Sequence, residues 1–486
     1  MKYATYIALI ASVSLTSVEG VKTEQVPKPE EVPKRMEKPP AMAQVKSQAR
    51  AKKDAMILDK VQTYLAQNGE RLNAKKNSRT KQPVTGKKMA QKSSKTSLAQ
   101  TTEEATTLRD AADGLGVYVG SAMKYKNMLA DEDVEGGQYA SKFLEEFDIM
   151  TTENWCKPAQ MLKATDDTLD TWYAKFDGCH YMNDWAIENQ IAHRGHALVW
   201  PSPGKYPSWF EDNYYDADGA YADEVEAWMI DWIITVMNEM GELYAWDVMN
   251  EAVHNSKAES ETITDYLKDT PFLAVDDFIC TAFKTAKTVA DENGWNTLMF
   301  YNEYDFESAA EDSEFYTKSQ NTYHLMKYLV DNDCGIDGVG YQTHIDIGYS
   351  DDDIQGIKDS FDMYADLGLY TQFTEIDVRC GKGNTNSKYT AICELEEGDD
   401  WTDEMLTAQG NVYRKLANAC IFKSNCLSFE TWGYVDGDYS FLSDPYNGFM
   451  FEEDYTPKKA YTQVFNKFSN ANRSNNEVVK RLAGEI

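Results

Sequence analysis

Eight short segments rich in β-branched and aromatic residues alternate with longer amphipathic segments along residues 115–433, and no other feature constrains the fold as strongly. Such alternation is typical of βα units and a parallel sheet. Helical periodicity is clearest over 223–240 and 276–294. Eight such units predict an α/β chain folded as a (β/α)8 TIM barrel, whose functional side chains gather where the strands end. The expected strands are 115–122, 147–154, 191–200, 243–251, 297–304, 336–345, 369–378 and 426–433.

The residues before the barrel differ in composition and are expected to lie outside it. Residues 1–20 combine Lys2 with an apolar run and small residues, which indicates a secretory signal peptide. Residues 21–100 carry 19 Lys and Arg against 7 Asp and Glu and are rich in Pro, Gln and Ser. This composition predicts a disordered basic extension. Within it, residues 55–72 have apolar side chains at helical spacing and predict a short helix.

Three interpretations of residues 21–100 stay open: a pro-segment that is cleaved, a basic tether to an anionic wall or matrix, and a solvated linker. The barrel domain is expected over 105–470. A flexible tail is expected over 471–486.

The charge of the chain bears on its partners. Its net charge of −32 argues against nucleic acid and anionic membranes, because phosphates would be repelled. A neutral substrate fits this surface better. After residue 20 no apolar run approaches the length that spans a bilayer, so we expect no membrane partner. We expect the protein to act as a monomer.

All eight cysteines lie after residue 150, and an even count in a secreted chain suggests disulfides. Cys420–Cys426 and Cys380–Cys393 are favoured because each pair closes a short loop. Cys156–Cys179 and Cys280–Cys334 then follow by elimination, although spacing alone leaves other connectivities open. The cysteines and histidines show no metal-binding spacing, and we expect no metal.

Two glutamates occupy the most informative positions of the predicted strands. Glu251 follows the apolar run that begins at Leu243, and Glu375 lies in the strand-like run 369–379. Because functional groups of a barrel gather at one end, these two carboxylates are expected to face each other. Opposed carboxylates on a rigid scaffold cleave glycosidic bonds, one as acid and base and the other as nucleophile or as base for water.

The motifs around these glutamates resemble glycoside hydrolase family 10, the endo-β-1,4-xylanases. The resemblance runs from about Leu108 to Phe465 and rests on seven motifs in the family's order. They are TLRDAADGLGVYVGSA, RGHALVW, WDVMNEA, YNEY, GYQTHID, FTEIDVR and TWGYVDGDYSFL. A single motif such as Asn-Glu would be weak, whereas seven in order are specific.

The resemblance implies that Glu251 is the general acid/base and Glu375 the nucleophile of a retaining enzyme that needs no metal or organic cofactor. The two carboxyl groups should then lie ~5–5.5 Å apart, close enough for a glycosyl-enzyme ester. Glu251 must be protonated in the first step. We expect the neighbouring negative charge to raise its pKa.

Other site residues also follow from the resemblance. Asn250 would bind the sugar 2-hydroxyl, and His344, in the Gln342-Thr-His344 segment, would orient Glu375. Asp377 in turn would hold His344, since such a chain keeps a carboxylate rigid.

On the minus side of the cleft, the resemblance implies that Asn154 and Lys157 bind hydroxyls of the neighbouring sugar. His196 and Trp200 would line the central subsite, and Trp432 would form an apolar floor beneath the reacting ring. It also implies a substrate-binding role for Asn302, and Tyr304 would be a stacking platform on the plus side.

The sequence departs from the family pattern directly after Trp200, where Pro201 and Pro203 replace hydrogen-bonding side chains. Acidic insertions at 211–226, 256–274 and 305–319 would reshape the rim. The altered proline loop leaves open a hydrolase of another β-1,4-glycan. A second alternative is a non-catalytic glycan-binding or matrix protein that is tethered by its basic extension.

Overall fold

The computed structural model describes residues 40–78, 105–132, 137–215, 219–313, 315–380, 401–437 and 447–482; it describes side chains of the first range only over 49–72 and of the last only to 471. The predicted signal peptide over 1–20 lies outside the described residues. So do nearly all of the residues in 26–40 and 75–97, whose composition most strongly predicts disorder.

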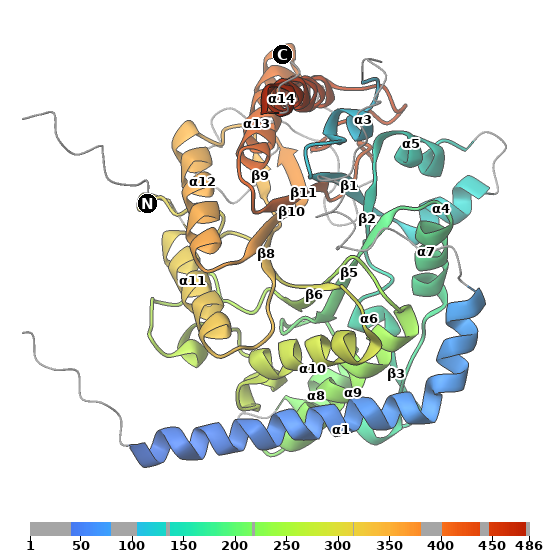
Figure 1. Cartoon of the computed structure of the whole chain (residues 1–486), viewed down its shortest axis with the longest axis vertical. Helices are drawn as coiled ribbons and strands as arrows, with labels where there is room; N and C mark the ends of the chain where they lie inside the picture. Colours follow the sequence, from blue (N-terminus) through green and yellow to red (C-terminus); the bar gives the residue numbers. More distant parts are fainter. Residues whose placement is uncertain are drawn as a thin grey trace, which may run out of the picture. The chain divides into compact units, whose positions relative to one another are not determined.

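Eight parallel strands close into a barrel, which confirms the predicted TIM barrel (Figure 1). They follow one another in the order β1, β2, β5, β6, β7, β8, β10, β11, and β11 pairs with both β10 and β1. The bounds are β1 Tyr118–Met123, β2 Ile149–Thr152, β5 Ala192–Val199, β6 Ala245–Asn250, β7 Leu298–Glu303, β8 Gly338–Tyr341, β10 Tyr370–Arg379 and β11 Cys426–Thr431. Each lies within a predicted strand or exceeds it by one residue.

Three further strands are too short for a sequence pattern to reveal. β3 (Leu162–Ala164) and β4 (Trp172–Ala174) form an antiparallel pair, and β9 (His344–Asp346) pairs in parallel with the end of β10. The strand that pairs with β10 on this side therefore changes along its length. Tyr370–Phe373 pair with β8, and Asp377–Arg379 pair with β9. Glu375 lies between these two paired stretches.

Helices surround the barrel, and α9 shows how sequence sets their ends. It begins with Asp223 and Glu224 in its first turn, where negative charge complements the helix dipole. It stops at Gly241, whose φ of 81° favours glycine.

The helix bounds are α1 Pro40–Ser78, α3 Leu108–Ala112, α4 Tyr125–Glu132, α5 Tyr139–Glu146, α6 Pro158–Met161, α7 Asp177–Glu188, α8 Ser208–Tyr214, α9 Ala222–Met240, α10 Phe278–Asn293, α11 Tyr316–Asp331, α12 Asp351–Asp366, α13 Asp403–Ile421 and α14 Lys459–Leu482, with 3-10 helices η1 Leu169–Thr171, η2 Ile263–Tyr266 and η3 Pro271–Ala274.

The helix predicted within residues 55–72 is confirmed, and α1 is longer than predicted. Its residues from Lys53 onward belong to the same compact unit as the barrel. Ile57 and Val61 are fully buried in the main hydrophobic cluster. Lys60 pairs with Asp231 of α9 at 2.7 Å. Residues 53–72 are therefore packed structure and not a solvated linker.

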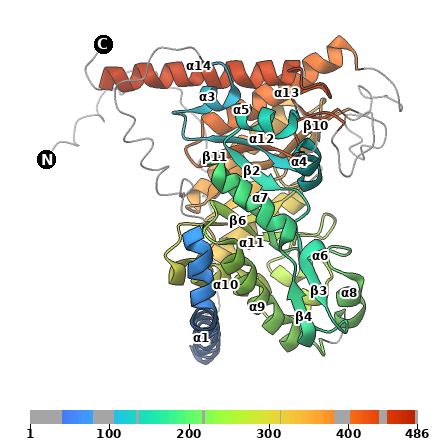
Figure 2. The ribbon, with the colours of Figure 1, turned by 90° about the vertical axis from the view of Figure 1, so that its right-hand side faces the viewer.

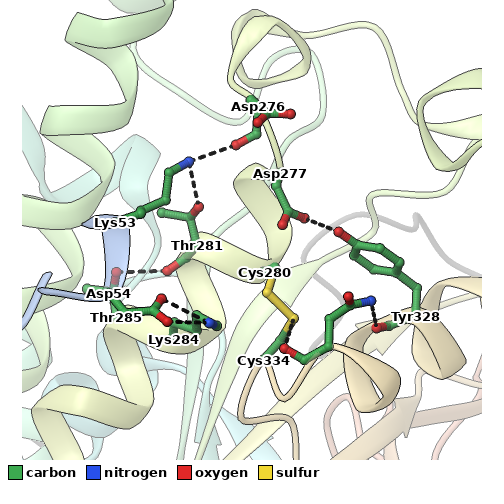
Figure 3. Close-up of a disulfide and its surroundings, with 11 residues drawn as sticks. Lys53, Asp54, Asp276, Asp277, Cys280, Thr281, Lys284, Thr285, Tyr328 and Cys334 are labelled. Atoms are coloured by element: carbon green, nitrogen blue, oxygen red, sulfur yellow. Dashed lines mark hydrogen bonds and ion pairs between the residues drawn. A yellow bond between two sulfur atoms is a disulfide. The ribbon is translucent and has the colours of Figure 1, made fainter. Parts of the chain in front are cut away.

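On α10, Lys284 donates to both carboxylate oxygens of Asp54 at 2.9 Å (Figure 3). Lys53 donates to the carbonyl oxygen of Asp276 at 3.0 Å, just before α10 begins. Basic side chains of α1 thus meet carboxylates of α9 and a backbone carbonyl before α10, while Asp54 meets a lysine of α10.

At the other end of the chain, α14 packs against α13 and α3 (Figure 2). Its backbone is helical to Leu482, so residues 471–482 of the expected flexible tail continue α14.

Three of the predicted disulfides are confirmed: Cys156–Cys179, Cys280–Cys334 and Cys420–Cys426. The predicted Cys380–Cys393 pair involves a residue outside the described ranges. Among the described residues, no helix combines the length and the apolar character needed to cross a membrane.

Candidate active site

Glu251 directly follows β6, where its backbone takes the left-handed conformation at φ 57°. Its carboxylate has four nearby donors. Trp200 Nε1 donates to Oε2 at 2.9 Å, and Gln342 Nε2 donates to Oε1 at 2.9 Å. Asn250 Nδ2 donates to Oε1 at 3.3 Å, and Lys268 Nζ lies 3.6 Å from Oε2. The carboxylate is held from several sides and is 13% exposed.

This environment corrects the expected pKa of Glu251. Burial acts to raise the pKa, but the Lys268 ammonium and the N–H donors of Gln342 and Trp200 outweigh it. The pKa of Glu251 is therefore lowered in the free protein, not raised. The sequence suggested the opposite because it gave no reason to place Lys268 beside this carboxylate.

Glu375 has a different set of partners. Asn302 Nδ2 donates to its Oε1 at 2.8 Å, and His344 Nε2 lies 3.3 Å from its Oε2. His344 Nδ1 lies 2.6 Å from Asp377 Oδ2, and Arg379 Nε lies 2.7 Å from Asp377 Oδ1. The predicted contacts from Asp377 to His344 and from His344 to Glu375 are both present.

The two acidic partners determine the charge of His344. Burial alone would lower its pKa, but Asp377 and then Glu375 raise it to about 10. His344 is therefore an imidazolium at neutral pH, and both of its ring nitrogens donate. Glu375 thus accepts one hydrogen bond from a neutral amide and one from a cation.

Two buried amides join the carboxylates into one network. The parallel register aligns Asn250 of β6 with Asn302 of β7, and Asn302 Nδ2 also donates to Asn250 Oδ1 at 3.0 Å. The chain of contacts runs from Glu375 through Asn302 and Asn250 to Glu251. Gly340 leaves room for it, since a Cβ there would lie 2.4 Å from Asn302 Oδ1. Asn250 is fully buried, with both ends of its amide engaged within the protein.

The five residues predicted for the minus side and central subsite also come together. Lys157 Nζ donates to Asn154 Oδ1 at 3.0 Å and lies 4.9 Å and 5.2 Å from ring centroids of Trp200 and Trp432. The His196 ring lies 5.2 Å from that of Trp432. Because Trp200 also donates to the acidic network, these aromatic side chains border it directly.

Tyr304 lies on another side of Glu251, next to Lys268. Its hydroxyl lies 3.5 Å from Lys268 Nζ, and its ring centroid lies 3.6 Å from Lys318 Nζ. Lys318 is fixed by a 2.9 Å ion pair with the buried Glu303. All thirteen predicted site residues therefore belong to one region.

A buried ionic group next to this region was not predicted from the sequence. Arg194 pairs with Asp247 and lies 3.4 Å from Glu430, and all three side chains are fully buried. Arg194 Nη2 also donates to the carbonyl oxygen of Thr374, the residue before Glu375. Arg194 and Asp247 lie in the motifs RGHALVW and WDVMNEA, and Glu430 lies in the predicted strand 426–433. A charged residue within an apolar strand was the signal that could have indicated this group.

The interpretation also missed two lysines. Lys205 Nζ, from the loop after β5, lies 4.1 Å from the Trp200 ring centroid. Lys268 lies between η2 and η3, within the insertion 256–274, where acidic residues outnumber lysines by four to two. Within the described residues, no cluster of His, Cys, Asp and Glu has the arrangement of a metal site.

Comparison with known proteins decides the family, because residues 107–467 match the model of glycosyl hydrolase family 10. The chain belongs to glycosyl hydrolase family 10. Similar proteins include endo-1,4-beta-xylanase B of Thermotoga neapolitana, which is 27% identical over 362 residues that cover 74% of this chain and 90% of that protein. Endo-1,4-beta-xylanase B of Neocallimastix patriciarum is 27% identical over 380 residues, covering 78% of this chain but 37% of that protein.

Solved structures agree on the fold. Xylanase 10B from Thermotoga petrophila, determined in complex with xylobiose, superposes with a TM-score of 0.62 at 24% identity. Native xylanase 10B from Thermotoga maritima gives a TM-score of 0.61 at 23% identity. Each comparison covers 76% of this chain and 100% of the other, so the shared fold extends over the whole of each solved chain.

Proposed function

We propose that this protein is a secreted retaining endo-β-1,4-xylanase that hydrolyses internal bonds of xylan through a covalent glycosyl-enzyme intermediate. One observation carries the proposal: two carboxylates share a hydrogen-bond network yet have different partners. Glu251 lies among Trp200, Gln342 and Lys268, while Glu375 accepts from Asn302 and the His344 cation. Membership of family 10 and the names of the relatives support the substrate class.

In the first step, an oxygen of Glu375 attacks the anomeric carbon while Glu251 protonates the departing glycosidic oxygen. This forms an ester between Glu375 and the sugar. In the second step, Glu251 takes a proton from water, which attacks the anomeric carbon and releases Glu375 as a carboxylate. Two inversions give net retention. The roles require carboxyl groups ~5–5.5 Å apart, which stays a prediction.

The surrounding residues have matching roles in this proposal. Asn302 and the His344 imidazolium hold Glu375 in one orientation, and Asp377 keeps His344 charged. Trp432, Trp200 and His196 provide apolar and aromatic surface for the reacting sugar. Asn154 and Lys157 would bind the next sugar, and Tyr304 would stack on the leaving side.

Two features support secretion as part of the proposal. The apolar segment over 1–20 has the composition of a signal peptide. Three disulfides agree with an oxidising compartment.

A substrate panel tests the proposed activity. Purified full-length protein is assayed for reducing ends on glucuronoxylan, arabinoxylan, cellulose and mixed-linkage β-glucan between pH 4 and 8. The proposal predicts rapid release of short xylo-oligosaccharides. Release from a glucan instead would favour the alternative β-1,4-glycan, which Pro201 and Pro203 motivate. No product from any of these polymers would exclude the proposal and favour a binding protein.

Variants of the two glutamates test their roles. We expect Glu375→Ala to lose nearly all activity, because no ester can form. Glu251→Ala should lose about 100- to 10,000-fold. Azide added to Glu251→Ala should give a β-glycosyl azide, and an α-azide would contradict the assigned roles. Glu259→Gln, an exposed position, is the matched control and should keep full activity.

A further inference from the structure

The insertion that carries Lys268 is attached to the residues that follow Glu251. Val253 and Leu267 form an antiparallel β-bridge. Lys268 N donates to the carbonyl oxygen of Ala252 at 2.9 Å. Two residues earlier, the carbonyl oxygen of Tyr266 accepts from the backbone N–H of His254 at 2.9 Å. Backbone hydrogen bonds on both sides of this bridge therefore fix Lys268 relative to the carboxylate.

The Lys268 ammonium lies between two groups of the proposed site. Its Nζ is 3.6 Å from Glu251 Oε2 and 3.5 Å from the hydroxyl of Tyr304. Its side chain is 10% exposed and that of Glu251 is 13% exposed, so little water screens the pair. At such burial an ion pair is stronger than on the surface. A protein of net charge −32 has thus enclosed a cation beside this carboxylate.

We propose that Lys268 is a positioning residue that acts through Glu251: its charge favours the carboxylate form and thereby sets the upper pH limit of activity. The inference rests on the proposed function for its effect on turnover. The pairing itself is a property of the free protein and can be measured without substrate.

Other charged groups also face this pair. Lys205 and Lys157 approach Glu251 across the Trp200 ring, at 4.1 Å and 4.9 Å from its centroid. Glu375 of β10 and the His344 cation lie across the network. Buried Glu303 and Lys318 lie behind Tyr304. Among the lysines in the described part of the chain, only Lys268 forms an ion pair with Glu251.

The electrostatics agree with this geometry. Burial raises the pKa of Glu251, and Lys268 is the strongest influence that opposes burial. Conversely, burial lowers the pKa of Lys268, while Glu303 and Glu251 raise it.

The consequence for catalysis has a definite sign. Leaving-group protonation needs the acid form of Glu251, so activity falls as pH rises through the pKa of Glu251. Removing the cation should raise that pKa and move the alkaline limb of the profile to higher pH. In the second step Glu251 must act as a base, and the charge of Lys268 favours the carboxylate form that this step needs.

The first test is the pH dependence of kcat/KM on xylan for the wild type and three variants. Lys268→Met should move the alkaline limb upward by at least about one pH unit. Lys268→Arg keeps the charge and should leave the limb near its original position. Lys257→Met changes the net charge equally at an exposed site of the same insertion and should not move the limb. A limb that stays in place in a folded Lys268→Met variant would overturn the proposal.

A second measurement separates this proposal from the proposed function. Carboxyl ¹³C NMR follows the titration of Glu251 in wild type and Lys268→Met, with Glu251→Gln to assign the signal. A higher midpoint in Lys268→Met supports the pairing even if no polymer is hydrolysed, in which case only the proposed function fails. An unchanged midpoint refutes the pairing whatever the activity. If Lys268→Met does not fold, Lys268→Gln is titrated with the same criteria.

Discussion

The Nε2 atom of His344 lies 3.3 Å from Oε2 of Glu375, and Asp377 holds the opposite ring nitrogen at 2.6 Å. This arrangement raises the pKa of His344 to about 10, against the effect of burial. The candidate nucleophile therefore has a permanent cation beside it throughout the neutral range. That cation holds the carboxylate in one orientation.

The first prediction concerns the charge of His344. Its imidazole should stay protonated from pH 5 to pH 8 and titrate near pH 10, whereas an unperturbed histidine titrates near 6.5. Imidazole ¹⁵N shifts in selectively labelled protein measure the midpoint. Asp377→Asn removes the strongest influence that raises the pKa, and the midpoint should fall. A wild-type midpoint near 6.5 would contradict this electrostatic account.

The second prediction links this titration to stability. Because the folded pKa lies above the unfolded one, the stabilisation is complete below about pH 6.5 and disappears as pH rises through about 10. Asp377→Asn should lack most of it. Urea unfolding at several pH values should therefore show a wild-type advantage over Asp377→Asn that shrinks between pH 7 and pH 10.5. A constant advantage would mean that Asp377 stabilises the fold by other contacts.

The third prediction concerns helix α1. Ile57 is fully buried, whereas the neighbouring Leu58 is 38% exposed. Ile57→Ala should lower the free energy of unfolding by about 2–5 kcal/mol. Leu58→Ala, the matched control, should change it by less than about 0.5 kcal/mol. Equal small effects in urea unfolding would show that α1 does not pack on the barrel in solution.

The fourth prediction compares two disulfides. Cys280–Cys334 spans 54 residues of sequence, and Cys420–Cys426 spans 6. Loop-closure entropy alone predicts about 4 kcal/mol of stabilisation from the first and about 2 kcal/mol from the second. Double serine variants of each pair, compared by thermal unfolding, should keep this order. The reverse order would show that loop length does not govern their contributions.

The fifth prediction concerns Gly340, which leaves room for the amide between the two glutamates. A Cβ at this position would lie 2.4 Å from Asn302 Oδ1, so Gly340→Ala must displace Asn302. A shift of about 1 Å at a catalytic group can cost on the order of 100-fold in rate. Gly69→Ala, where no atom lies within 4 Å of the added carbon, is the control and should keep full activity. Unchanged kcat/KM in Gly340→Ala would show that the network tolerates the displacement.

Sequence patterns predicted the barrel well because each of its strands is a β-rich run with helical periodicity between runs. β3 and β4 were not predicted because three residues do not establish a period, and the predicted strand 336–345 merged β8 with most of β9. The packing of α1 was not predicted: apolar spacing predicted the helix, but the acidic groups that it meets on α9 lie far away in the sequence.

The same limit applies within the site. The thirteen candidate residues came from motifs at strand ends, and the structure brings them together. Lys268 could not be predicted, because it lies in an insertion and approaches Glu251 only through the bridge between Val253 and Leu267. The error in the expected pKa of Glu251 followed directly from that omission.

Glu251 and Glu375 are proposed to cleave the glycosidic bond by double displacement. ¹H NMR of the first products released from xylan, recorded before mutarotation, tests this mechanism. Double displacement predicts that the new reducing ends appear as the β-anomer and convert slowly to the equilibrium mixture. Initial appearance of the α-anomer would show a single displacement and refute the mechanism.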